Sequence, residues 1–166
     1  AFDYPPSPGL TDLRAAIGER YDRSAAEVLL TVGTQEANFL AFQSLLDPGD
    51  HAVVITPTYQ ALHSLPDTIA DVTRVSLEPP EWSLDVDAVA DAIQPETRLL
   101  VLNNPNNPTG RYHALETVQA LYDLAVDADA HLLADEVYRL LSPDPLPTVA
   151  SMGSHGISTT SLTKAY

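Results

Sequence analysis

The sequence predicts an α/β domain with a mainly parallel sheet and helices on both faces. Short aliphatic or β-branched runs alternate along the chain with stretches in which apolar residues recur at helical spacing. Turn-forming residues separate these stretches, as in DPGD at 47–50 and NNPNNPTG at 103–110. This alternation is typical of parallel strands joined by helical crossovers, which cover the sheet on both sides.

The expected strands are the apolar runs themselves. In chain order they are EVLLTVG (27–33), HAVVITP (51–57), VTRVSLE (72–78), RLLVLNN (98–104), AHLLADE (130–136) and GISTTSL (156–162). Helical spacing is seen in Leu10, Leu13 and Ile17, then in Ala37, Leu40 and Ser44, and again in Val118, Leu121, Leu124 and Ala125. Ser24 and Glu27 have capping-box spacing, but we give this signal little weight because a strand-like run follows them. We find no internal repeat and no linker, so we expect residues 1–166 to form one domain.

The charge of the chain excludes several classes of partner. Its 23 acidic and 8 basic residues give a formal net charge of −15, which disfavours binding to nucleic acid or to anionic membranes. The acidic residues are dispersed and the aliphatic content is high, so the chain is not a disordered acidic tail. An acidic, lysine-poor surface favours a halophilic source, and the alternative is a merely acidic mesophilic domain.

Composition also restricts the chemistry and the location. The chain has no cysteine, which excludes disulfides, thiolate catalysis and cysteine-ligated zinc, and its histidines have no metal-ligand spacing. No apolar run approaches the roughly 18–20 residues that span a bilayer, and no basic, apolar leader opens the chain. We therefore expect a cytoplasmic protein without a bound metal. The chain begins without Met, which suggests part of a longer protein.

Unusual polar residues follow the expected strands, at the edge where ligands bind in open α/β sheets. Gly33 comes after VLLTV and opens a helical stretch, so the amides of Thr34 and Gln35 could bind a phosphate group. The alternative is a simple turn. Tyr59 follows HAVVI, and Ser161 follows GISTT. These junctions could converge on one crevice.

Three further residues of this edge have reactive or charged groups. Asp135 ends an apolar run and is either the counter-ion of a buried ligand cation or a cap of the next segment. Tyr138 could reach the same pocket or lie in the core, and Asn107 is presented by a proline-bracketed loop. Lys164 is the only lysine, and its place beside these groups favours a nucleophilic amine over a solvated surface residue.

The motifs together resemble the class I/II aminotransferase superfamily, whose members are fold-type I enzymes dependent on pyridoxal phosphate. The resemblance runs through the whole chain, in YPPSPGLTDLRAAI, TVGTQEA, DPGD, PTY, NNPNNPTG, ADEVY and SLTKAY. It implies that residues 1–166 belong to the large domain that binds pyridoxal 5'-phosphate. It also implies transfer of an amino group between an amino acid and a 2-oxo acid.

The resemblance assigns the catalytic roles. It implies that Lys164 forms a Schiff base with the cofactor and then moves the α-proton of the substrate. It implies that Asp135 pairs with the pyridine nitrogen and keeps it protonated. In the same way, Asn107 and Tyr138 are expected to hydrogen-bond the 3-oxygen of the ring.

The remaining cofactor contacts are implied in the same way. Tyr59 matches the residue that stacks on the cofactor ring, and Gly33, Thr34, Gln35 and Ser161 match those that hold the phosphate.

A second copy of the chain is also implied. Tyr4, in DYPPSPG, matches the tyrosine that family members lend to the phosphate of the neighbouring subunit, so a homodimer is expected.

The resemblance also implies that the chain is incomplete at both ends. Family members continue past the lysine with a further helix, an antiparallel strand, a phosphate-binding arginine and a small domain. A β-lyase, a decarboxylase or a synthase would share the same cofactor site, and a truncated cofactor-binding fragment without activity is a further alternative. A nucleotide-binding module is disfavoured, because the chain contains neither G-x-G-x-x-G nor G-x-x-x-x-G-K-[ST].

Overall fold

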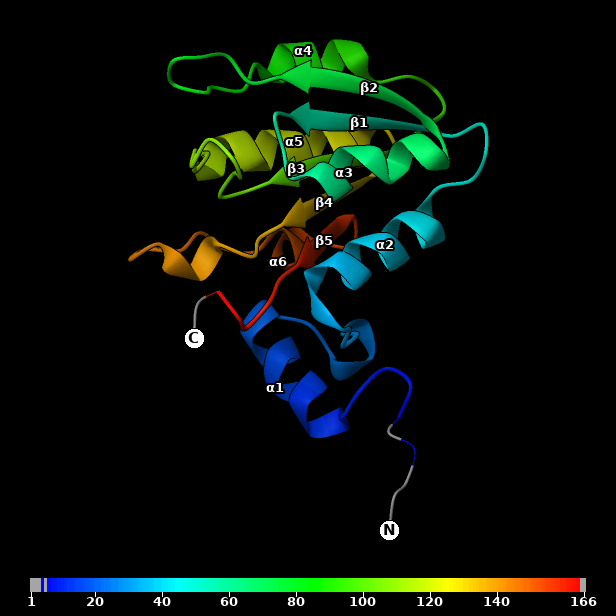
Figure 1. The fold of residues 1–166 in the computed structure, drawn as a ribbon, viewed down its shortest axis with the longest axis vertical. Coiled ribbons are helices and arrows are strands. Elements are labelled where there is room, and N and C mark those ends of the chain that lie inside the picture. The colour runs from blue at the N-terminus through cyan, green and yellow to red at the C-terminus, as the bar shows by residue number, and fades with distance from the viewer. Residues whose placement is uncertain (1–3, 5, 165–166) are drawn as a thin grey trace.

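One five-stranded sheet forms the centre of the chain as far as the structure describes it (Figure 1). The computed structural model describes residue 4 and residues 6–164, so the last two residues of SLTKAY lie outside it. The strands are β1 (His51–Thr56), β2 (Asp71–Ser76), β3 (Thr97–Asn103), β4 (His131–Asp135) and β5 (Gly156–Thr159). Their order is β2-β1-β3-β4-β5, and every neighbouring pair is parallel. The predicted α/β class is confirmed.

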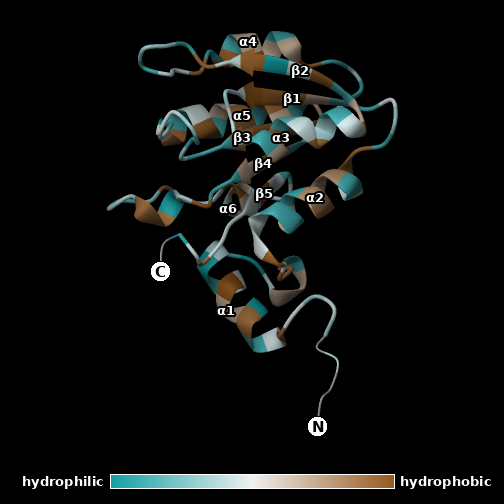
Figure 2. Cartoon of the chain, viewed as in Figure 1, coloured by the Kyte–Doolittle hydropathy of each residue, from teal (hydrophilic) through white to brown (hydrophobic). Residues whose placement is uncertain are grey.

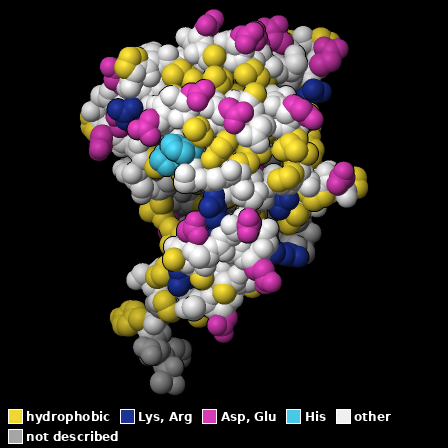
Figure 3. Space-filling view, turned by 180° about the vertical axis from the view of Figure 1, so that it is seen from behind, with side chains coloured by type: hydrophobic (Ala, Val, Ile, Leu, Met, Phe, Trp, Pro, Cys, Tyr) yellow, Lys and Arg dark blue, Asp and Glu magenta, His cyan; other side chains and the backbone are white. Residues whose placement is uncertain are grey.

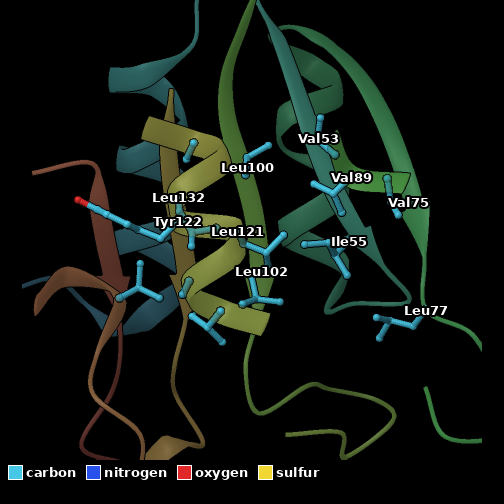
Figure 4. Packing of buried hydrophobic residues seen from close by; sticks show 14 residues of the cluster. Val53, Ile55, Val75, Leu77, Val89, Leu100, Leu102, Leu121, Tyr122 and Leu132 are labelled. Atoms are coloured by element: carbon cyan, nitrogen blue, oxygen red, sulfur yellow. The ribbon is translucent and has the colours of Figure 1, made fainter. Parts of the chain in front are cut away.

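Helices cover both faces of this sheet. The helices of the described chain are α1 (Thr11–Tyr21), α2 (Gly33–Leu45), α3 (Gln60–Ser64), α4 (Val86–Ala92), α5 (Leu115–Asp127) and α6 (Val149–Met152), with 3-10 turns η1 (Ala25–Glu27), η2 (Pro66–Thr68) and η3 (Arg139–Leu141). Phe42 of α2 and Leu62 of α3 pack on one face. Val89 of α4 and Leu121 of α5 pack on the other, in the cluster drawn in Figure 4.

Strand β1 shows why the sequence forms a sheet that is buried on both faces. Ala52 and Val54 belong to the cluster under α2 and α3, whereas Val53 and Ile55 belong to the cluster under α4 and α5. Because successive strand residues point to opposite faces, an uninterrupted apolar run fills both cores. The apolar, brown run of β1 in the sheet is visible in Figure 2.

The predicted strand over 27–33 is wrong. Glu27 ends η1, and a helix begins at Gly33, with no strand between them. Val32 is 90% exposed and Leu29 is 53% exposed, so this apolar run does not enter the sheet. The capping box of Ser24 and Glu27 does form, so the low weight given to it was also wrong. The run is too exposed to join the sheet as a strand. The segment before it instead forms the 3-10 turn that the capping box predicts.

Two arginines connect the segment around α1 with the main body, although α1 lies apart from the sheet in Figure 1. Arg23 donates hydrogen bonds to the carbonyls of Ala150 and Gly153 at α6. The guanidinium of Arg139 lies 5.7 Å from the ring centroid of Tyr21 in α1. These contacts hold α1 beside α6 and η3.

The strand register places three polar residues in one row at that edge. Asn103 of β3 is aligned with Asp135 of β4, and Asp135 is aligned with Thr159 of β5. All three are buried. The carboxyl ends of β3, β4 and β5 are therefore polar, and they can form the floor of a binding site.

The charge is spread over the surface. Figure 3 shows acidic side chains scattered across one face, with few basic ones among them. In residues 4 and 6–164 there is no helix with the length and apolar character needed to cross a membrane.

Candidate cofactor site

A pocket of about 300 Å³ lies at the carboxyl edge of the sheet. Its lining residues are Gly33, Thr34, Gln35, Asn38, Tyr59, Asn103, Asn107, Asp135, Val137, Tyr138, Ser161, Thr163 and Lys164. Every residue predicted for the site lines this pocket except Tyr4, whose side chain is 96% exposed. The structure thus brings together groups from segments that are far apart in the sequence.

The first turn of α2 forms one end of the pocket. Gly33 has φ 80°, a backbone conformation that residues with a Cβ rarely adopt, and no side chain caps the helix start at Val32. The Gly33 N–H donates to the Thr31 carbonyl (3.0 Å), and the next amides of this first turn have no acceptor within the helix, so they give the pocket a donor-rich end that suits an anion. The hydroxyl of Thr34 donates to the Thr160 carbonyl (3.1 Å), which connects this turn with the chain after β5.

Asp135 lies in the middle of the polar row at this edge, between Asn103 and Thr159, and is only 4% exposed. Burial raises the pKa of its carboxyl, and hydrogen bonds from the Asn38 amide and the Val137 amide oppose that rise. The Val137 N–H donates to Oδ1 (3.1 Å), so Asp135 also caps the segment that follows it. Among the described residues no ion pair involves Asp135, and its carboxylate therefore suits a cationic group of a ligand.

Two asparagines hold the 103–110 loop, and one of them, Asn103, connects it with Asp135. The Asn103 side chain donates to the Asp135 carbonyl (2.9 Å), and its Oδ1 accepts from the Asn107 N–H (2.7 Å). Asn106 donates to the Pro57 carbonyl (3.0 Å), and its Oδ1 accepts from the Thr109 hydroxyl (2.7 Å). These bonds hold the loop, which agrees with its predicted rigidity and brings Asn107 to the pocket wall.

The amine of Lys164 lies at the rim. Its Nζ is 6.0 Å from the ring centroid of Tyr138, and the side chain is exposed in the described chain. Within the described residues this amine is therefore open to solvent and not desolvated. The hydroxyls of Ser161 and Thr163 lie 2.8 Å apart beside it. Across the pocket, the Tyr59 hydroxyl donates to Gln35 Oε1 (2.9 Å).

Sequence reasoning missed some of the polar residues of this site. Asn38 was overlooked because it lies within an apolar helical stretch, although it is four residues after Thr34 and so lies on the same face of α2. Asn103 was counted only as part of the strand and loop. The signal for Asn38 is a polar residue on the buried side of a helix, which has to find a partner.

Glu136, next to Asp135, is also buried but faces away from the pocket. Its Oε1 accepts from the Val149 N–H (2.8 Å), and its Oε2 lies 4.0 Å from Arg139 Nε. Burial raises the pKa of Glu136 to about 7, and these neighbours offset only part of the effect. The carboxylate is a structural link to α6 rather than a part of the pocket.

Glu136 should make stability depend on pH. The folded state raises the pKa of this carboxyl from 4.5 to about 7 and therefore binds its proton more tightly than the unfolded chain does. Its stabilising contribution is present below about pH 4.5 and is lost as the pH rises through about 7. Between these limits wild type should lose on the order of 3 kcal/mol relative to Glu136→Gln, as urea unfolding at each pH would measure. Parallel curves for the two proteins would contradict this.

No group of histidine and acidic residues in the described part of the chain is placed to hold a metal ion. His51 and His113 are buried, and burial lowers the pKa of each, to about 4 for His113. Both lie outside the pocket lining. The chemistry of the site therefore rests on its carboxylate, amides, hydroxyls and amine.

Comparison with known proteins identifies the family. Residues 1–166 match the family described as aminotransferase class I and II. The chain belongs to this family. Its members use pyridoxal phosphate as their cofactor.

Similar proteins of the family share both sequence and fold with the chain. An aspartate/prephenate aminotransferase of Thermus thermophilus is 38% identical over 83% of this chain and 38% of its own length. A probable N-succinyldiaminopimelate aminotransferase of Mycobacterium tuberculosis is 34% identical over 98% of this chain and 45% of its own. A PLP-dependent aminotransferase from Streptococcus suis superimposes with a TM-score of 0.93 at 31% identity, over 100% of this chain and 45% of its own. The chain thus spans less than half the length of these relatives.

Proposed function

We propose that the whole protein is a pyridoxal-phosphate-dependent aminotransferase, and that residues 1–166 form most of the cofactor site in its large domain. One observation carries the proposal beyond family membership. Asp135, a buried carboxylate that forms no ion pair with any residue the structure describes, shares a pocket with Lys164, the one lysine of residues 1–166. A lysine amine and a carboxylate partner for the ring nitrogen are two of the groups that hold this cofactor in a protein.

The pocket fits the cofactor in its other parts as well. The open first turn of α2, with Gly33 at its start, suits the phosphate, and Ser161 adds a hydroxyl there. Asn107 and Tyr138 have hydrogen-bonding side chains in the wall, which suit the oxygen on the ring. The half-exposed ring of Tyr59 offers a stacking surface.

The proposed chemistry divides between the cofactor and the chain. The bound cofactor supplies an electron sink for the carbanion that forms when a substrate loses its α-proton. Asp135 holds the proton on the ring nitrogen and balances its charge. Lys164 supplies the amine that attaches the cofactor and afterwards moves the α-proton of the substrate. Asn107 and Tyr138 orient the ring by hydrogen bonds to its oxygen.

A second copy of the chain completes the proposed site. Tyr4 does not line the pocket of its own chain, and its side chain is almost fully exposed. We infer that it contacts the phosphate in a neighbouring subunit, which makes a homodimer the active form.

The acidic, lysine-poor composition supports a protein from a high-salt cytoplasm. Its unfolding midpoint should then rise as KCl increases from millimolar to molar concentration, whereas a midpoint that does not change with salt would argue for an ordinary acidic protein.

An assay of the whole protein tests the proposed reaction. An amino acid and 2-oxoglutarate should be converted to the corresponding 2-oxo acid and glutamate, and the assay should depend on added pyridoxal phosphate. Release of ammonia and pyruvate without amino transfer would instead assign the protein to the β-lyases, and release of carbon dioxide would assign it to the decarboxylases.

A further inference from the structure

We propose that Asn38 is a positioning residue, which orients the Asp135 carboxylate toward the ring nitrogen of the cofactor. The inference rests on the proposed function, and it adds a residue to the site from the interior of α2. Asn38 acts through Asp135, so its contribution should be specific to whatever Asp135 binds.

The hydrogen bonds around Asn38 fix its orientation. Its Nδ2 donates to Asp135 Oδ2 (3.0 Å), and its Oδ1 accepts from the hydroxyl of Thr159 (2.7 Å). An ionised carboxylate only accepts hydrogen bonds, so the amide nitrogen has to face Asp135. The Thr159 hydroxyl then donates to the remaining oxygen. With both its nitrogen and its oxygen bonded, the Asn38 amide cannot flip without loss of these two hydrogen bonds.

Burial makes this arrangement strong. Asn38 is 1% exposed, and its two partners are buried beside it. Water therefore competes little for these bonds, and the low local dielectric strengthens a hydrogen bond to a charged group. Loss of the Asn38 donor would leave one oxygen of a buried carboxylate without its partner.

The bonds also determine what Asp135 can still bind. Asn38 donates to Oδ2 and the Val137 N–H donates to Oδ1, so each oxygen has one protein donor. A carboxylate has about four acceptor positions in total. Both oxygens thus keep the capacity to accept a proton-bearing nitrogen from the pocket, with the plane of the group already fixed.

Asn38 further connects the two ends of the pocket. Thr34 and Asn38 lie one turn apart on the same face of α2, and both bond to the segment that includes β5. Thr34 belongs to the anion-binding turn, whereas Asn38 reaches the carboxylate. The same helix therefore sets the spacing between the phosphate end and the nitrogen end of the site.

The test compares cofactor binding with and without the ring nitrogen. Apo whole protein would be dialysed to equilibrium against pyridoxal phosphate, and separately against the analogue in which carbon replaces the ring nitrogen. We expect wild type to prefer pyridoxal phosphate. In Asn38→Leu, which is close in size but has no donor, that preference should fall about tenfold or more, since a hydrogen bond to a charged group is lost. Affinity for the analogue should change by about twofold at most, because the analogue makes no use of the carboxylate.

Two further variants make the result specific. Thr159→Val retains the amide but removes the hydroxyl that orients it, and should reduce the preference about threefold, the effect of losing one neutral hydrogen bond. If Asn38→Leu does not fold, the preference of Thr159→Val for pyridoxal phosphate over the analogue tests the inference in its place. Asn104→Leu is the control: Asn104 is a buried amide that bonds to the His113 backbone outside the pocket lining. This control should retain the wild-type preference.

The contrary outcomes are distinct. An unchanged preference in Asn38→Leu, or in Thr159→Val if only that variant folds, would overturn the inference. Equal loss of both ligands would overturn it too, because Asn38 would then only support the shape of the pocket. Failure of wild type to bind pyridoxal phosphate at all would instead contradict the proposed function.

Discussion

Replacing Lys164 with Ala should abolish amino transfer by the whole protein, with a fall in kcat of at least about a thousandfold. Lys164 is the one lysine among residues 1–166 and it lines the pocket, so no other lysine of this part of the protein could take its place. Steady-state kinetics with an amino acid and 2-oxoglutarate would measure the loss. Lys164→Arg should be as inactive, because a guanidinium keeps the positive charge but does not lose its proton in proteins.

Arg111→Ala is the matched control for this experiment. It removes one positive charge from an exposed residue near the 103–110 loop, and Arg111 does not line the pocket. Its kcat should remain within about threefold of wild type, since screened surface charges contribute little. If the two alanine variants lost activity equally, charge rather than the amine would be the cause.

Asp135→Asn should reduce activity by about 100-fold or more, the second-largest effect that we expect. The variant retains the size of the side chain but removes the charge that balances a protonated ring nitrogen. Loss of one partner from a buried charge pair costs about 2–5 kcal/mol, which corresponds to roughly 30-fold to several thousandfold. Steady-state kcat/KM and the cofactor dissociation constant would measure the effect.

Glu136→Gln is the control for the charge change at Asp135. Glu136 is the adjacent carboxylate, and it is buried to the same degree but bonds to Val149 outside the pocket lining. We expect its activity near pH 7 to stay within about threefold of wild type, because its carboxyl is already half protonated there. If Glu136→Gln lost as much activity as Asp135→Asn, the total negative charge at this edge of the sheet would be the cause. The pairing of Asp135 with the ring nitrogen would then not explain the loss.

The sequence was sufficient for those parts of the site that lie where a strand or turn ends. Asp135 follows an apolar strand and Gly33 opens a helix, and both positions can be inferred from the local pattern alone. Their convergence follows from the parallel sheet, since the carboxyl ends of all its strands share one edge. Strands β1, β3 and β4 could be predicted because buried parallel strands are nearly continuous apolar runs. The edge strands β2 and β5 are more exposed and include polar residues, so their signal is weaker.

What the sequence could not predict depends on tertiary contacts. The run at 28–32 has strand-like composition, but the neighbour needed to bury it is lacking in the described part of the chain, so it stays outside the sheet. Asn38 lies among apolar helical residues, and only the packing of α2 over β4 and β5 reveals its partners. A run with strand-forming composition becomes a strand only where a neighbouring strand can pair with it. The role of a buried polar residue can be assigned only when its hydrogen-bond partner is known.

Reductive trapping tests the central claim most directly. The whole protein would be incubated with pyridoxal phosphate, reduced with borohydride and digested, and the labelled peptide would be sequenced. We predict that the pyridoxyl group lies on Lys164, within the SLTKAY stretch, and that Lys164→Arg yields no labelled peptide from this region. A pyridoxyl group on a different lysine, or none on a protein that binds the cofactor, would contradict the account.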